Sequence, residues 1–180
     1  MMCIRFRSGF PAALCLLSTL AMLAGCAGVS GPGARKQALA LAPEAMVQTI
    51  RAAAGDGDGE LAVQPLRDPA VEDLRTRAAT LEAQGDITGA AAALDEALAV
   101  VPDDPALLQE RAEVAILQRD LDHATQLVER AYSMGAQVGP LCRRHWVTFE
   151  QVRLATGDAA GAEQARHQAE GCRVAGPARY

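Results

Sequence analysis

Apolar residues recur along this chain at the spacing of amphipathic helices, and residues typical of turns separate the helical stretches. The clearest stretch runs from Gly85 to Pro105: it opens with Gly-Asp, continues as an alanine-rich apolar run and closes on Pro-Asp-Asp-Pro. Its aspartate, Asp86, recurs as Asp120 and again, after a slightly longer interval, as Asp158. A pattern that returns at a nearly fixed period defines a structural unit, here a helix pair that must stack on another pair to bury its apolar face. The sequence therefore predicts an all-α array of helical hairpins.

Aspartate-proline pairs mark where helices begin. In Asp68-Pro69 and Asp104-Pro105, the carboxylate can cap the first free N–H groups and the proline suits the first turn. Glycines such as Gly85 suit the left-handed residue that ends a helix. The helices expected from these signals cover residues 43–54, 69–84, 87–101, 105–119 and 121–132, followed by a third hairpin that turns at Gly157 and ends near Gly171.

Small and apolar residues occupy matching positions in the three hairpins. These positions are Leu74, Ala78, Leu81, Ala90, Leu94, Ala97 and Pro102 in the first, Leu108, Ala112, Ala115, Ala124, Val128 and Ala131 in the second, and Trp146, Ala162 and Ala169 in the third. The set resembles the tetratricopeptide repeat over residues 69–172, with two clear repeats and a degenerate third. The resemblance implies a short right-handed solenoid of helical hairpins in which facing alanines let helices approach closely.

The third repeat departs from the pattern. Glu150, Arg153 and Arg166 stand where small or apolar residues are expected, and the repeat is slightly longer than the second. We expect the additional residues in the loop from Ser133 to Gly139. The alternative to a solenoid is a helical hairpin bundle without repeat stacking.

The beginning of the chain has the pattern of a bacterial signal sequence. Two arginines, Arg5 and Arg7, precede an uncharged stretch that includes an apolar core and then Leu-Ala-Gly-Cys, ending at Cys26. This motif resembles a lipobox, which implies cleavage after Gly25, acylation of Cys26 and stable anchoring by several acyl chains. Because Ala27 follows the cysteine, the resemblance favours the outer membrane, with the body of the protein in the periplasm. The alternative is an uncleaved membrane-spanning helix, which the glycines and Pro32 of this stretch interrupt.

These signals divide the chain into five segments. We expect a signal peptide (1–25), a lipidated flexible tether (26–42), an N-terminal helix with an extended capping segment (43–68), the repeat domain (69–172) and a C-terminal tail (173–180).

The charge balance excludes some partners. Loss of residues 1–25 removes two of the 17 basic residues and none of the 22 acidic ones, so the remainder carries a formal net charge of −7. Nucleic acids require a basic surface, so we expect none as a partner. An acidic body is also repelled by anionic lipid, so attachment to a membrane should come from the acylated Cys26.

The segment after residue 54 alternates glycine with carboxylates, which suggests a calcium loop. A twelve-residue calcium loop counted from Asp56 needs glycine at its sixth place and a carboxylate at its twelfth. Those places hold Leu61 and Arg67, so we expect a flexible turn instead. We expect Leu61, Val63 and Leu66 to lie extended against the first repeat.

Two cysteines remain after the signal peptide and the lipidated cysteine are set aside. The turn at Gly157 lies midway in sequence between Cys142 and Cys172, so in an antiparallel helix pair these two residues should be level with each other. In the oxidising periplasm this placement predicts a disulfide. The alternative is a zinc site with His145 and His167, but the spacing of His167 from Cys172 makes its side chain point elsewhere, so we expect no metal.

The sequence favours binding over catalysis. It contains no nucleophile elbow and no phosphate-binding glycine loop, so we expect no enzyme activity and no cofactor besides the lipid on Cys26. The resemblance implies that the first helix of each repeat lines a concave groove that binds a protein or peptide. Groove positions expected on this basis are Arg75, Glu82, Gln109, Glu113, Ile116, Leu117, Arg144 and Val147.

These expectations combine into one functional hypothesis and its alternatives. The hypothesis is an adaptor or scaffold for envelope assembly, anchored in the outer membrane and facing the periplasm. The alternatives are a self-associating structural module, an adaptor for pilus or secretin assembly or for cell-wall hydrolases, and a cell-wall enzyme with an unrecognised site.

Overall fold

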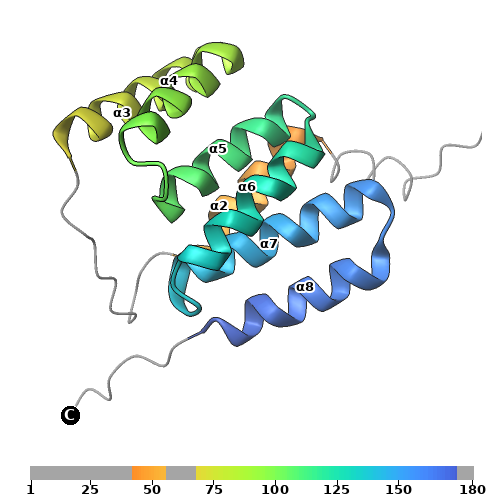
Figure 1. The fold of residues 1–180 in the computed structure, drawn as a ribbon. Coiled ribbons are helices and arrows are strands. Elements are labelled where there is room, and N and C mark those ends of the chain that lie inside the picture. Colours follow the sequence, from red (N-terminus) through yellow and green to blue (C-terminus); the bar gives the residue numbers. More distant parts are fainter. Residues whose placement is uncertain (1–41, 56–67, 174–180) are drawn as a thin grey trace, which may run out of the picture. The chain divides into compact units, whose positions relative to one another are not determined.

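All regular secondary structure in the described part of the chain is helical. The computed structural model describes residues 42–55 and 68–173 (Figure 1). The predictions of a signal peptide, of acylation at Cys26, of a flexible turn after residue 55 and of an extended stretch with Leu61, Val63 and Leu66 concern residues outside these ranges. The helices are α2 (Pro43–Ala52), α3 (Pro69–Ala83), α4 (Ile87–Val100), α5 (Pro105–Leu117), α6 (Leu121–Met134), α7 (Gly139–Thr156) and α8 (Ala159–Gly171).

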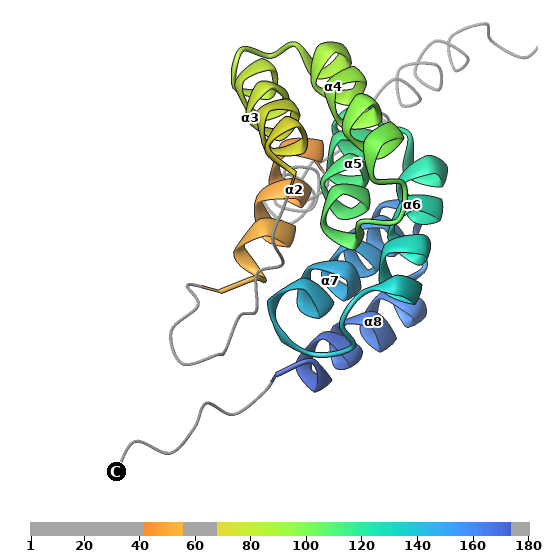
Figure 2. The ribbon, with the colours of Figure 1, turned by 60° about the vertical axis from the view of Figure 1, so that its left-hand side comes forward.

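Six of the helices form three consecutive hairpins, α3/α4, α5/α6 and α7/α8, and each hairpin packs on the next through α4 with α5 and α6 with α7 (Figures 1 and 2). Ala112 on α5 and Ala124 on α6 are fully buried at a hairpin contact. Their small side chains allow the two helices to pack closely. The predicted all-α solenoid of helical hairpins is confirmed.

The recurring aspartates are helix caps. The side chains of Asp86, Asp120 and Asp158 each accept a hydrogen bond from the backbone N–H three residues on, at 2.8, 3.0 and 2.8 Å. Asp68 and Asp104 cap α3 and α5 in a related way. A cap of this kind contributes about 1 kcal/mol to helix stability. Because the capping aspartates recur along the sequence, their period marks where successive helices begin.

The turn inside each hairpin passes through a left-handed residue. Gly85 and Gly157 have φ of 83°. The equivalent position of the second repeat is Arg119, with φ of 63°. A side chain in this conformation costs roughly 1–2 kcal/mol, so this turn is strained where its two counterparts are not.

The additional residues of the third repeat lie in a helix and not in the predicted loop. The loops before α5 and α7 have the same length, but α7 has 18 residues where α5 has 13. Ser133 and Met134 are still helical, and Pro140 lies in the first turn of α7, where its missing N–H costs nothing. The prediction of a longer loop was therefore wrong. The extra turn carries Cys142.

Helix α2 lies against α5 and α7 and so belongs to the core of the second and third repeats (Figure 2). Met46, Val47 and Ile50 form its apolar face and are almost completely buried. None of the helices in the described ranges has both the length and the apolar character that crossing a membrane requires.

Candidate functional site

An open cleft separates the first helices of the first two repeats. Helix α3 packs on α4, and α4 packs on α5, but no Cα atom of α3 comes within 8 Å of a Cα atom of α5. The space between α3 and α5 is a cavity of about 490 Å³, here called the α3–α5 cleft. Its lining residues are Arg51, Glu72, Arg75, Thr76, Ala78, Ala79, Glu82, Ala83, Leu94, Glu110, Glu113, Val114 and Arg144.

The cleft has an apolar floor and a charged rim. Ala78, Leu94 and Val114 are buried at its base, whereas the small residues Ala79 and Ala83 of α3 are exposed to it. Small side chains on one wall leave room for the side chains of a bound partner. The volume lies within the usual range of ligand-binding pockets, but the charged rim makes the lining more polar than is usual for a small-molecule site.

Arginines bridge the two walls of the cleft. Arg75 of α3 bonds Glu110 of α5 and also Glu72 on its own helix. At the other end, Arg51 of α2 bonds Glu82 of α3 at 2.8 Å and Glu113 of α5 at 2.8 Å. The hydrogen bond to Glu110 raises the pKa of Arg75, and the hydrogen bond to Glu82 raises the pKa of Arg51, so both arginines stay charged. The lining includes four glutamates and three arginines, which leaves one unit of negative charge in excess.

Helix α2 lies next to this cleft, against α5 and α7. Its residues Met46, Val47 and Ile50 share a core cluster with Ile116 of α5 and Val152 of α7. Here the space between α5 and α7 that α2 occupies is called the α2 slot.

Three predicted groove residues face this slot. Ile116 is fully buried, and Leu117 and Val147 pack partly buried against the same cluster. Ile116 is therefore enclosed by the chain's own helices, and its predicted exposure to a partner was wrong. Leu117 and Val147 keep part of their surface exposed, so their role in partner binding stays a prediction.

A buried carboxylate joins the three helices of the α2 slot. Glu113 is fully buried and accepts hydrogen bonds from Arg51 of α2, Arg144 of α7 and the side-chain amide of Gln109. The Gln109 amide also donates to Thr148 Oγ1 at 2.9 Å. Gln109, predicted to face a bound partner, is thus an interior residue, whereas Glu113 holds the helices together and also lines the α3–α5 cleft.

The same network fixes the protonation of His145. A carboxylate can only accept, so the Gln109 nitrogen faces Glu113, and Gln109 Oε1 accepts from His145 Nδ1 at 2.7 Å. His145 Nε2 is then the unprotonated nitrogen, buried without a hydrogen-bond partner among the described residues. Burial, assisted by the charge of Arg144, lowers the pKa of His145 to about 4. The folded protein therefore contains neutral His145 throughout the physiological pH range.

Acidification should destabilise the protein through this histidine. Between pH 6.5 and pH 4, the unfolded chain binds a proton that folded His145 does not, so stability falls as the pH is lowered. We expect a loss of about 2 kcal/mol between about pH 7.5 and pH 5, measured by urea unfolding. The variant His145→Gln should lack this component, and the variant His167→Gln, at an exposed histidine, should retain it. Equal pH dependence in both variants would contradict the assignment.

Two contributions to the site were not predicted from the sequence. Arg51 directly follows Ile50 of the apolar face of its helix. This position in the sequence could have indicated that Arg51 forms an ion pair at the edge of the buried surface. Arg143, near the start of α7, donates to the carbonyl oxygens of Ala53 and Ala54 at 2.9 and 2.7 Å and so satisfies the end of α2.

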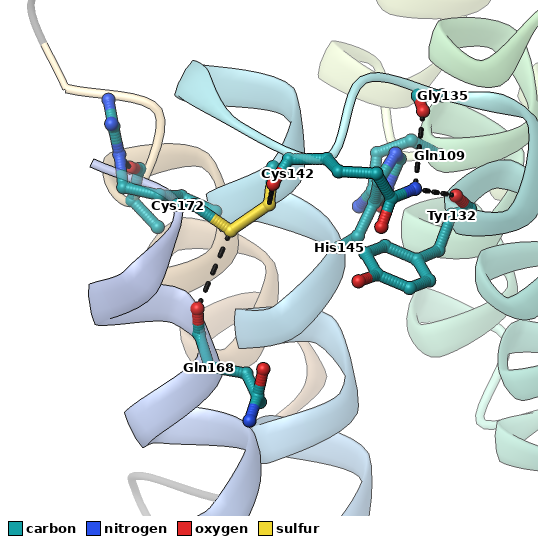
Figure 3. The surroundings of a disulfide bond; sticks show 10 residues. Gln109, Tyr132, Gly135, Cys142, His145, Gln168 and Cys172 are labelled. Carbon is teal, nitrogen blue, oxygen red and sulfur yellow. Dashed lines mark hydrogen bonds between the residues drawn. A yellow bond between two sulfur atoms is a disulfide. The ribbon is translucent and has the colours of Figure 1, made fainter. Parts of the chain in front are cut away.

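The end of the third hairpin is closed by a disulfide between Cys142 and Cys172, whose Cα atoms are 5.8 Å apart (Figure 3). His145 lies one turn further along α7, beside Gln109 and Tyr132 (Figure 3). His167 is exposed on α8. Within residues 42–55 and 68–173, no cluster of three or more His, Cys, Asp or Glu side chains is arranged to hold a metal.

The repeat-signature residues lie mostly in the core. Leu74, Leu81 and Trp146 are half-buried, and Pro102 is exposed in the loop before α5. The buried members are Ala78, Ala90, Leu94, Ala97, Leu108, Ala112, Ala115, Ala124, Val128, Ala131, Ala162 and Ala169.

Comparison with known proteins agrees with this architecture. Residues 71–114 match the tetratricopeptide repeat family. No curated protein sequence gives a significant match. The structure of the globular C-terminal domain of P. aeruginosa LpoP is similar, with a TM-score of 0.56 and 32% sequence identity, over 58% of this chain and 99% of that one. This similarity shows that the chain belongs to the family of the C-terminal domain of LpoP, and in this chain that fold contains a tetratricopeptide repeat.

Proposed function

We propose that the protein is an adaptor, anchored by lipid on the periplasmic face of the outer membrane, that binds a protein partner through the α3–α5 cleft. Tetratricopeptide repeats are protein-interaction modules, and the family supports an interaction role for this chain. The observation that carries the proposal is the cleft itself, an open cavity of about 490 Å³ on the face where the neighbouring slot already holds a helix.

The location rests on the sequence. The lipobox-like Leu-Ala-Gly-Cys sequence supports acylation at Cys26, and Ala27 supports the outer membrane. With an acidic body, the acyl chains supply the membrane attachment. Residues 27–41 then link the anchor to α2 in the sequence.

Site-specific photo-crosslinking in cells tests this function. A photoreactive residue at Ala79, which lines the cleft, should give a protein adduct, whereas the same residue at the adjacent Thr80, exposed but outside the lining, should give little. The variant Glu110→Arg should weaken the Ala79 adduct, because it reverses a charge on the rim. The variant Cys26→Ser should prevent acylation and release the protein from the membrane fraction.

Two outcomes would contradict the proposal. Equal adduct yields at positions 79 and 80 would show that the cleft is not the binding surface. Membrane retention and acylation in the Cys26→Ser variant would remove the proposed anchor.

A further inference from the structure

The α3–α5 cleft is the counterpart, one repeat earlier, of the slot that α2 fills. The α5 positions Gln109, Glu113, Ile116 and Leu117 line the α2 slot or its polar network. In the register that aligns Asp86 with Asp120, the equivalent positions of the first repeat are Arg75, Ala79, Glu82 and Ala83, and all four line the cleft.

The opposite walls correspond as well. Val152 of α7 contacts α2 in its slot, and the register that aligns Asp120 with Asp158 pairs it with Val114, which lies at the base of the cleft. Thr148 corresponds in the same register to Glu110 on the cleft rim. The cleft and the α2 slot are thus lined by corresponding positions of successive repeats, and the protein's own helix occupies the slot.

The occupied site shows what kind of ligand such a site accepts. Helix α2 has ten residues, buries an apolar face made by Met46, Val47 and Ile50, and places Arg51 on the carboxylate of Glu113. The ligand is therefore a short amphipathic helix that carries one cation beside its apolar face.

The residues that differ between the cleft and the α2 slot indicate how the ligand of the cleft should differ from α2. Ala79 and Ala83 stand where the α2 slot has Glu113 and Leu117, so the cleft has more room for side chains of the bound helix. Glu82 and Glu110 stand where the α2 slot has Ile116 and Thr148, so the rim is more acidic. Each of these two carboxylates accepts two hydrogen bonds from one arginine, and a carboxylate has about four acceptor positions, so both can accept a further donor.

We infer that the α3–α5 cleft binds an amphipathic α-helix of the partner protein, with bulky apolar residues against Ala79 and Ala83 and an arginine or lysine against the glutamate rim. This inference rests on the proposed function and specifies its ligand. The excess negative charge of the lining complements the cation, and the bound helix would lie in the cleft as α2 lies in its slot.

A peptide with the sequence of residues 43–54 is a direct probe of the cleft. The protein used is residues 26–180 with Cys26→Ser, and binding of the fluorescent peptide is followed by anisotropy. We expect saturable binding, weakened about tenfold or more by Ala79→Trp, which fills the cleft, and changed less than about twofold by Thr80→Trp, its matched control. A peptide with Arg51→Glu should bind at least about fivefold more weakly. Ala83→Trp is a second cleft-filling variant should Ala79→Trp not fold.

The outcomes separate this inference from the function on which it rests. Absence of peptide binding would overturn the helical ligand, while a crosslink at Ala79 would leave the adaptor function standing. Binding that neither cleft-filling variant weakens would show that the peptide exchanges with α2 in its own slot, and would also overturn the inference. If the protein forms a homodimer in which one copy occupies the cleft of the other, the ligand is a second copy of this chain, and the assignment to a different partner is overturned.

Discussion

Replacement of Glu113 by alanine is expected to lower the free energy of unfolding by about 3 kcal/mol, because the half-buried Arg144 guanidinium and the buried Gln109 amide lose the carboxylate that accepts their hydrogen bonds. Glu113 is fully buried and bonds Arg51, Arg144 and Gln109, which come from three different helices. Without it, two guanidinium groups and an amide lose their common acceptor. Urea unfolding at neutral pH measures the change.

An exposed ion pair is the control for this prediction. Asp103 pairs with Arg130 in a pair whose side chains are 64% and 47% exposed. Exposed pairs contribute about 0–1 kcal/mol, so Asp103→Ala should change stability little. A cost for Glu113→Ala no larger than that for Asp103→Ala would contradict the role of the network.

The same variant tests whether Glu113 holds α2 in its slot. Amide hydrogens of α2 should exchange with solvent much faster in Glu113→Ala than in the parent protein, since Arg51 loses one of its two anchors. Amides of α4, which contributes no residue to this network, should change less. Uniform acceleration in all helices would indicate general destabilisation instead of local release of α2.

The hairpins could be predicted from the sequence because the signals that define them are local. Asp86, Asp120 and Asp158 cap helices through their own backbone three residues on, and the alanine spacing places small residues on the contacting faces. Each of these interactions lies within one repeat, and its return at a nearly constant interval makes it visible in a single sequence.

The position of α2 could not be predicted, because it depends on contacts between residues far apart in the chain. The pattern Met46, Val47 and Ile50 shows that one face of α2 is buried, but it does not specify against which helices. Arg51 bonds Glu113, 62 residues away. Without knowledge of this contact, Ile116 is interpreted as an exposed groove residue, because no local pattern indicates that the α2 slot is filled.

The length of the third repeat shows a second limit. A slightly longer repeat is equally compatible with a longer loop and with one additional helical turn, since both restore the next helix to its place. The structure adds the turn to α7, where Cys142 is brought level with Cys172. Pro140 was compatible with either arrangement, because proline suits both loops and first helical turns.

Loss of the disulfide is expected to have an effect as large as loss of Glu113. The bond joins residues 30 positions apart, and closing a loop of this length stabilises the folded state by about 3–4 kcal/mol through the unfolded chain. The double variant Cys142→Ala and Cys172→Ala should lose this amount in urea unfolding. Reduction of the parent protein by dithiothreitol should reproduce the loss, and the double variant should not respond to reduction.

Helix α8 is the helix whose end this bond secures. Among the described helices it packs closely only on α7, and its buried residues are the alanines Ala162, Ala165 and Ala169, which bury little apolar surface each. The disulfide and the bond from the Gly139 N–H to the Cys172 carbonyl hold its C-terminal end. Hydrogen exchange in the double variant should therefore accelerate first in the last turns of α8, and retained protection there would show that alanine packing alone secures the end of the array.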